Sequence, residues 1–370
     1  MTLTPERAGA PLDPDHEADR EAFAGRLGAM IMATMETQTI YLGERLGLYA
    51  SLRDDGPATS AQLAERTGTH ERYIREWLEQ QAAADILTVD DPAKPAADRV
   101  FTLPSGRAEV LLDAESPYLV GPLTRMVQAA AARADDLQAV YRTGAGIDWA
   151  AYGADMIEAQ EAINRPQFQA FVGDWIDALP DIAERLRVGG ARVADVACGT
   201  GWSSIWIARH FPGATVDGID VDAGSIERAT ATAAREGLDD RVTFRFADAA
   251  AAEGAGQYDL VTIFEALHDM SRPAEVLRAA RGLLAPGGAV LIADERVGET
   301  FSAPSDQDRM FYGYSVLACL PNGLYDAPSV GTGTVIRPST VEALAREAGF
   351  SRTTILPTEH DAFRFYRLDP

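Results

Sequence analysis

The sequence has almost no lysine, little cysteine and no long apolar run. Lys94 is the only lysine among 33 basic residues, and 56 acidic residues give the chain of 370 residues a net charge of −23. A chain this acidic repels phosphate backbones, so we expect no nucleic acid among its partners. Cys198 and Cys319 are the only cysteines and are far apart in the sequence, so they predict neither a disulfide framework nor a metal site.

The lack of apolar runs also bears on where the protein works. No run reaches the ~18 residues that a membrane span requires. The first residues do not combine a basic start with an apolar core, so we see no secretory signal. We therefore expect a cytoplasmic protein with no membrane partner. Residues 1–18 are polar, with three prolines and several acids, which is typical of a disordered tail.

Residues 19–110 have the pattern of a winged helix–turn–helix. Two helices are expected at residues 60–67 and 70–84, with a short turn between them, and two short strands follow at residues 86–89 and 100–103. Helices joined by a short turn and followed by a hairpin are typical of this motif. The motif often binds DNA, which makes a DNA-binding regulator one interpretation of the chain.

The charge of this part of the chain favours a different role. Residues 1–110 carry 11 basic and 19 acidic residues, a net charge of −8. A domain that reads DNA needs a basic face. We therefore interpret residues 19–110 as a structural or dimerisation module. Residues 111–185 are mainly helical and rich in aromatic side chains, and we expect a connector that walls a small-molecule pocket.

Residues 186–370 alternate between apolar strands and helices. The expected strands are residues 192–197, 215–220, 242–247, 258–264, 289–294, 353–356 and 363–368. This alternation predicts a parallel sheet covered by helices on both faces. The fold class is therefore α/β, with a Rossmann-like seven-stranded sheet preceded by a mainly helical winged-helix domain. We expect an apolar, aromatic insertion at about residues 300–338 to form a lid.

Candidate binding residues lie at the carboxyl ends of these strands, where ligands bind in such sheets. Asp195 precedes a tight turn that contains Gly199 and Gly201, and glycine lets a backbone approach a ligand closely. Asp220 and Asp248 follow at the ends of the next two strands. The third glycine of a dinucleotide fingerprint is absent. An acid before the turn would repel a phosphate but suits a cationic aminoacyl group.

Together these residues resemble the class I S-adenosylmethionine-dependent methyltransferases, although Ala197 stands where that family usually has glycine. With its N-terminal domain, the chain is similar to plant-type and bacterial small-molecule O-methyltransferases that dimerise through a winged helix. The resemblance implies S-adenosylmethionine as cofactor, S-adenosylhomocysteine as product and a homodimer. It also implies cofactor contacts from Asp195, Gly199 and Gly201 at the methionine, from Asp220 at the ribose, and from Asp248 and Val221 at the adenine, with Ala249 and Phe264 also beside the cofactor.

His268 is the candidate general base. Methyl transfer to oxygen needs an aligned acceptor and removal of its proton, and histidine is the usual base near neutral pH. His268 and Asp269 resemble the His-Asp-Trp motif of these O-methyltransferases, whose histidine is the base, with Met270 in place of the tryptophan. The resemblance assigns Glu295, an acid after the fifth strand, as the partner of His268. We predict methyl transfer to a hydroxyl or carboxyl oxygen of a small, partly apolar molecule.

Other functions fit the same residues. A C- or N-methyltransferase would use the same cofactor site and give His268 another purpose. A protein of this fold could also bind S-adenosylmethionine and catalyse a different reaction, such as a cyclisation, or act as a regulator. The sequence does not identify the acceptor.

Overall fold

The computed structural model describes residues 14–251 and 256–370, and the chain divides into two compact units at Asp113 and Ala114. Most of the predicted disordered tail, residues 1–13, lies outside the described residues. The prediction is wrong for residues 14–18, because helix α1 begins at Pro14. Proline suits the first turn of a helix, and the acids that follow it favour the helix N-terminus. None of the described helices is long and apolar enough to span a bilayer.

The first unit has the predicted winged helix–turn–helix. Its elements are α1 (Pro14–Arg45), α2 (Leu48–Asp54), α3 (Ser60–Thr67), α4 (Glu71–Ala83), β1 (Thr88–Val89), β2 (Phe101–Thr102) and α5 (Ser105–Leu112). Thr59 and Gln62 form a capping box that starts α3, and Gly68 ends the helix with φ of +65°. Leu63 and Leu78 bring α3 and α4 into one apolar core.

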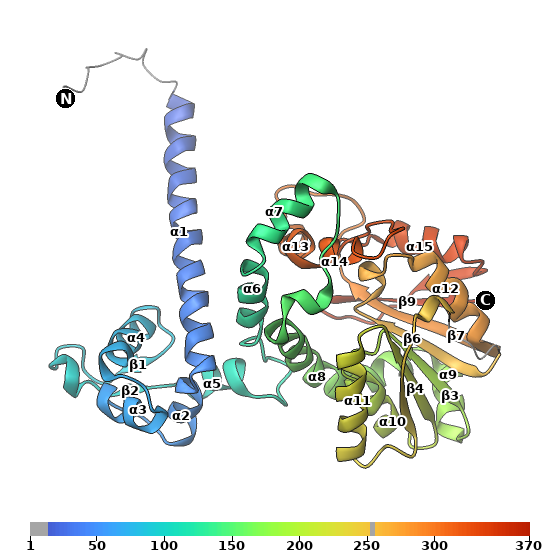
Figure 1. Ribbon diagram of the computed structural model, residues 1–370, viewed down its shortest axis with the longest axis horizontal. Helices are drawn as coiled ribbons and strands as arrows, with labels where there is room; N and C mark the ends of the chain where they lie inside the picture. The colour runs from blue at the N-terminus through green and yellow to red at the C-terminus, as the bar shows by residue number, and fades with distance from the viewer. Residues whose placement is uncertain (1–13, 252–255) are drawn as a thin grey trace. The chain divides into compact units, whose positions relative to one another are not determined.

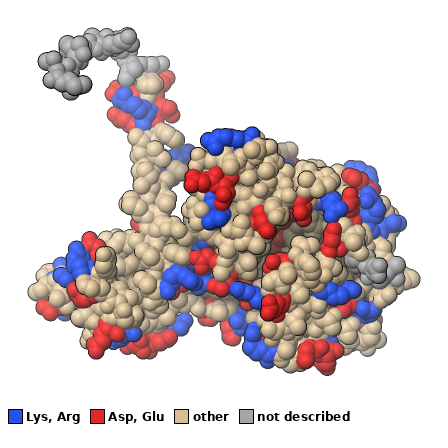
Figure 2. Space-filling view, in the orientation of Figure 1, with Lys and Arg blue, Asp and Glu red and all other residues tan. Residues whose placement is uncertain are grey.

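Helix α1 differs from the rest of this unit because much of its apolar surface is uncovered. Exposed large apolar side chains along it are Phe23, Leu27, Met30, Ile31, Met32, Met35 and Leu42. Figure 2 shows few charged side chains along the middle of this helix, which Figure 1 labels. An apolar stretch of this length on a helix is unusual for a surface that faces only water.

The second unit is built on a seven-stranded sheet with the order β5-β4-β3-β6-β7-β9-β8. The strands are β3 (Arg192–Val196), β4 (Thr215–Asp220), β5 (Val242–Phe246), β6 (Tyr258–Phe264), β7 (Leu284–Glu295), β8 (Arg352–Ile355) and β9 (Phe363–Asp369). The first five are parallel, and β9 and β8 add an antiparallel edge. This confirms the predicted α/β class. The chain order reverses between β3 and β6, so the carboxyl ends of these two strands flank the expected ligand crevice.

Helices cover both faces of this sheet (Figure 1). On one face lie α9 (Pro180–Val188) and α10 (Trp202–His210), and on the other α12 (Pro273–Leu283) and α15 (Pro338–Glu347). Side chains alternate between the two cores along each strand, so Leu291 joins the first core and Ile292 the second. Helix α11 (Ala223–Arg235) packs beside β4 and β5.

The predicted connector, residues 111–185, mostly belongs to the second unit. It contains α6 (Leu123–Ala131), α7 (Ala134–Thr143) and α8 (Ala154–Asp177), which precede α9. Trp175 and Ile176 of α8 are buried in the same core as strand β3. The expected lid contains α13 (Asp306–Tyr314), a π-helical turn (Ser315–Cys319) and α14 (Leu320–Gly323).

Candidate active site

A tight turn joins β3 to α10, and its backbone takes up left-handed conformations. The φ angle is +57° at Ala197, +52° at Gly199 and +84° at Gly201. A Cβ on Gly201 would lie 2.5 Å from the ring of Phe244, so only glycine fits there. The left-handed conformation costs a non-glycine residue about 1–2 kcal/mol. Ala197 therefore keeps the conformation of a glycine at some energetic cost.

Asp195 lies beneath this turn and does not line the cavity that the turn borders. Its side chain is 1 % exposed, and its carboxylate accepts hydrogen bonds from Ser203 (2.5 Å), Ser204 (2.6 Å) and Thr262 (2.8 Å). Burial raises the pKa of Asp195, and these hydroxyl donors lower it. The predicted contact with the methionine is therefore corrected: Asp195 faces inward and fixes α10 and β6 relative to β3.

Asp220 ends β4 and faces the cavity. Its Oδ2 accepts a hydrogen bond from the backbone N–H of Gly199 at 2.8 Å, and its Oδ1 accepts one from Asp222 at 2.8 Å. The carboxylate thus ties the glycine turn to the end of the neighbouring strand. Val221, the next residue, is 65 % exposed and also lines the cavity.

Asp248, Ala249 and Phe264 line the same cavity. Asp248 follows β5, where its Oδ2 accepts a hydrogen bond from Arg272 at 2.8 Å. Phe264 is the last residue of β6, and its ring packs edge-on against Trp175, with ring centroids 5.6 Å apart. This part of the cavity offers an apolar ring and a carboxylate close to the carboxyl ends of two strands.

The cavity itself has a volume of about 1380 Å³ and lies within the second unit. Such a volume can hold a nucleoside-sized ligand together with a second small molecule. Helix α8 forms one wall. The expected lid contributes Met310, Phe311, Tyr314 and Ala318 to the lining. Apolar and aromatic side chains there favour an acceptor with apolar surface.

His268 lies just beyond β6, in a buried position at the edge of this cavity. Its Nδ1 is 2.6 Å from Oδ1 of Asp294, and its backbone N–H donates to Oδ2 of the same residue at 3.3 Å. The other ring nitrogen, Nε2, lies 3.5 Å from Asp269. If Asp294 accepts the Nδ1 proton, neutral His268 carries its lone pair on Nε2.

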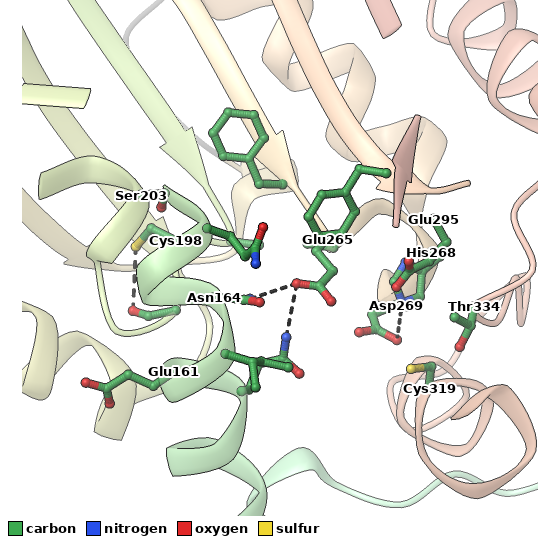
Figure 3. A pocket seen from close by; sticks show the side chains of 18 of the residues that line it. Glu161, Asn164, Cys198, Ser203, Glu265, His268, Asp269, Glu295, Cys319 and Thr334 are labelled. Atoms are coloured by element: carbon green, nitrogen blue, oxygen red, sulfur yellow. Dashed lines mark hydrogen bonds and ion pairs between the residues drawn. The ribbon is translucent and has the colours of Figure 1, made fainter. Parts of the chain in front are cut away.

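The predicted partner of His268 was wrong by one residue. Asp294 binds the ring, whereas Glu295 makes no hydrogen bond to it. Adjacent residues of a strand point to opposite faces, so the two acids at the end of β7 cannot both take this position. Glu295 instead lines the cavity near His268, as Figure 3 shows.

Acidic neighbours control the charge of His268. Burial by itself lowers the pKa of the imidazole, but the charges of Asp269 and Asp294 outweigh burial and raise the pKa well above its ordinary value. The protonated ring is therefore stabilised by this site. A histidine in such a place is a strong proton acceptor once it is neutral.

Glu265 is a further carboxyl group of the cavity. Its Oε2 accepts hydrogen bonds from Asn164 (2.7 Å) and Gln160 (3.0 Å) of α8 (Figure 3). Burial raises the pKa of Glu265 to about 7, against the lowering effect of the Asn164 hydrogen bond. The residue follows β6 directly, so its place at a strand end was a signal in the sequence. Its two amide partners lie about 100 residues earlier and gave no signal.

Cys319 closes the site beyond His268. The donor atoms of Cys319, His268 and Asp269 lie within 4.8 Å of one another, which is a spacing that a metal ion could use. Burial and the charge of Asp269 raise the pKa of the thiol to about 11. The thiol is therefore protonated at neutral pH.

Comparisons with known proteins agree with this geometry. Residues 194–290 match the model of a methyltransferase domain, and residues 34–112 match an Rv2258c-like winged HTH domain. A ubiquinone biosynthesis O-methyltransferase of Stutzerimonas stutzeri (strain A1501) is 31% identical over 189 residues, which cover 50% of this chain and 72% of that protein. The chain belongs to the S-adenosylmethionine-dependent methyltransferases.

Solved structures share the fold of this methyltransferase along almost the whole chain. The mitomycin 7-O-methyltransferase MmcR has a TM-score of 0.69 at 20% identity, covering 95% of this chain and 99% of its own. Human N-acetylserotonin methyltransferase, solved in complex with S-adenosylmethionine, has a TM-score of 0.65 at 16% identity, covering 98% and 99%. At sequence identities this low, the similarity to these structures shows a shared fold alone.

Most of the predicted site residues of this methyltransferase meet in one cavity. The residues that line it are Gly199, Asp220, Val221, Asp248, Ala249, Phe264, His268 and Glu295. Asp195 and Gly201 do not line it. Asp195 lies beneath the turn, and Gly201 allows the turn to pack closely against Phe244. Sequence reasoning missed Asp294 as the partner of His268. It also missed the hydrogen bonds that Asn164 and Gln160 donate to Glu265.

Proposed function

We propose that this methyltransferase transfers the methyl group of S-adenosylmethionine to an oxygen of a small, partly apolar acceptor and releases S-adenosylhomocysteine. The observation that carries the proposal is the buried pair of His268 and Asp294 beside the cavity. A histidine held by a carboxylate is a suitable proton acceptor for a hydroxyl. The name of the Stutzerimonas relative supports oxygen as the acceptor atom.

The residues at the strand ends fit the cofactor. Asp220 would accept the ribose hydroxyls, Asp248 and Val221 would flank the adenine with Ala249 and Phe264, and the backbone around Gly199 would meet the methionine. When bound, the cofactor supplies an activated methyl group on its sulfonium. Gly201 supports the fit, because its missing Cβ leaves the turn close to β5.

The protein then has two tasks, to align the acceptor and to accept its proton. Phe311 and Tyr314 of the expected lid would hold an apolar acceptor against the cofactor. The acceptor hydroxyl would give its proton to Nε2 of His268 as its oxygen takes the methyl group, with S-adenosylhomocysteine as the leaving group. Asp294 and Asp269 stabilise the imidazolium that results.

Two measurements test this function. Titration calorimetry with S-adenosylmethionine should show binding that Asp220→Ala weakens at least tenfold, because the variant lacks the ribose acceptor. Asp239→Ala, at an exposed acid outside the cavity, is the control. Release of S-adenosylhomocysteine should then be followed over a panel of phenols and hydroxy acids. His268→Ala should keep cofactor affinity and lose about 100-fold in turnover; full turnover in that variant would exclude the proposed role.

We also propose that the protein is a homodimer, assembled through its N-terminal unit. The exposed apolar surface of α1 supports this, because a second copy of the helix would cover it. The acidic balance of residues 1–110 argues against DNA as the partner.

A further inference from the structure

Glu265 sits in a backbone conformation that few side chains adopt. Its φ is +52°, and its N–H donates to the carbonyl of Ala293 at 2.7 Å, directly after β6. A conformation of this kind costs about 1–3 kcal/mol and persists where the surroundings enforce it. The strain turns the Glu265 side chain toward the cavity at the carboxyl end of β6.

The two amides fix one oxygen of Glu265 and leave the other available. Asn164 and Gln160 are four residues apart on α8, so they lie on one face of the helix and reach the same atom, Oε2. Among the described residues, no group donates a hydrogen bond to Oε1. Glu265 lines the cavity, so this oxygen is available to a hydrogen-bond donor of a ligand.

Glu295 presents a second carboxyl group to the same cavity. Its side chain is 7 % exposed, and no hydrogen bond to its carboxylate is found in the described part of the chain. Burial and the charge of Glu265 raise the pKa of Glu295 well above its ordinary value. The two carboxyl groups therefore repel each other when both are ionised, and a cation between them would relieve the repulsion.

The rest of the cavity wall is also rich in acidic side chains. Twelve carboxyl groups line it: Asp148, Glu161, Asp174, Asp220, Asp222, Asp248, Glu265, Asp269, Glu295, Asp326, Glu359 and Asp361. The only arginines in this lining are Arg272, which binds Asp248 and Glu275, and Arg296, which donates to the carbonyl of His360. A cavity of this charge attracts cations and repels anionic acceptors.

We propose that Glu265 and Glu295 dock a protonated amino group of the acceptor, so that the methyltransferase selects amine-bearing hydroxy compounds. The proposal rests on the proposed function, and it adds the class of acceptor. The cofactor also carries an ammonium group; Figure 3 shows Glu265 between the turn at Cys198 and His268, with Glu295 on the His268 side. The docked group would hold the acceptor while its hydroxyl faces His268.

Three phenols that differ in one group provide the probes. Tyramine carries an ammonium, 4-ethylphenol is neutral and 3-(4-hydroxyphenyl)propionate carries a carboxylate. Calorimetry on the full chain saturated with S-adenosylhomocysteine should give tyramine at least tenfold tighter binding than 4-ethylphenol, with the acid weakest. Equal or tighter binding of 4-ethylphenol, or no binding of any probe, would overturn the proposal.

Variants then assign the effect to the carboxyl pair. Glu265→Gln and Glu295→Gln should each weaken tyramine binding about tenfold and leave 4-ethylphenol unchanged. Glu359→Gln, which removes the same charge from an exposed part of the lining, should change neither by more than about threefold. Weaker binding of S-adenosylhomocysteine by Glu265→Gln, with unchanged preference among the phenols, would make Glu265 a cofactor residue and sink the proposal.

Proton release gives a second readout that a merely structural role would not produce. With a pKa of about 7, Glu265 is partly protonated at pH 7, and a docked ammonium favours its ionised form. Tyramine binding at pH 7 should therefore release protons, measured in two buffers of different ionisation enthalpy, and Glu265→Gln should reduce the release. Proton uptake on binding, or release that is identical in Glu265→Gln, contradicts the proposal.

Failure of the inference and failure of the proposed function give different results. If tyramine binds selectively but S-adenosylmethionine is not converted to S-adenosylhomocysteine, the docking site is supported and methyl transfer to these phenols is rejected. Turnover of neutral phenols without amine selectivity keeps methyl transfer and rejects the docking site.

Discussion

At the scale of single residues, the site depends on which of two adjacent acids faces His268. Asp294 is fully buried and holds Nδ1, while Glu295 faces the cavity with a free carboxylate. The first acid can orient the ring and stabilise its protonated form, and the second can bind a ligand. Exchanging their roles would leave the ring without a partner and an unpaired charge at the strand end.

Asp294→Asn should therefore slow methyl transfer about 100-fold while cofactor affinity stays unchanged. Asp294 raises the pKa of His268, so its loss should lower that pKa and move the rising limb of the pH–rate profile to lower pH. Turnover measured between pH 5 and 9 checks both effects. Glu295→Gln is the comparison: Glu295 lies near His268 but does not bind its ring, so its loss should move the rising limb less, and an equal shift in both variants would contradict the assignment.

Sequence reasoning reached His268 but not its surroundings, and the reason is physical. A histidine beyond a strand end is a local pattern, visible in the segment that follows β6. The phase of β7 decides between Asp294 and Glu295, and a shift of one residue changes the face of the sheet. The hydrogen bond from Asn164 to Glu265 depends on how α8 packs against the sheet, and no local sequence pattern encodes that packing.

At the scale of elements, the turn between β3 and α10 is the segment that we propose binds the cofactor. The sequence predicted this turn and the alternating strands well, because apolar runs and glycine turns are local signals. It placed the start of β7 at residue 289, but the strand begins at Leu284, because pairing with β6 extends it through the glycines. It also gave Asp195 to the ligand, although three hydroxyl donors bury it beneath the turn.

Asp195→Ala should destabilise the protein by about 3 kcal/mol, because it leaves three buried hydroxyls without their acceptor. Ser203→Ala removes one of these hydrogen bonds and should cost about 1 kcal/mol. Urea unfolding of the full chain, followed by circular dichroism, measures both. Asp220→Ala should differ, with a large loss of cofactor affinity beside a loss of stability of about 2 kcal/mol from its two backbone hydrogen bonds. A stable Asp195→Ala protein with impaired cofactor binding would return Asp195 to the ligand.

At the scale of the whole molecule, the two units present very different surfaces. The second unit buries its apolar residues in cores on both faces of its sheet and contains a cavity lined with carboxyl groups. The first unit leaves apolar side chains of α1 exposed along several turns. The acidic charge of the sequence predicted a structural or dimerisation module, and the family resemblance implied a homodimer; the uncovered helix is the surface on which we propose that the dimer forms.

Placing charges on this helix should therefore split the proposed dimer. Leu27 and Ile31 are four residues apart, so they share one face of α1, and both are about half exposed. The double variant Leu27→Glu, Ile31→Glu should be monomeric in sedimentation equilibrium at concentrations where the parent is dimeric. Arg26→Glu also adds an acid to α1 but spares the apolar side chains, so it should stay dimeric. Since the described lining of the cavity comes from the second unit alone, the monomer should keep its affinity for S-adenosylmethionine. A monomeric parent protein would reject α1 as the interface, and a double variant that loses cofactor affinity along with its partner would show that the second copy supports the site.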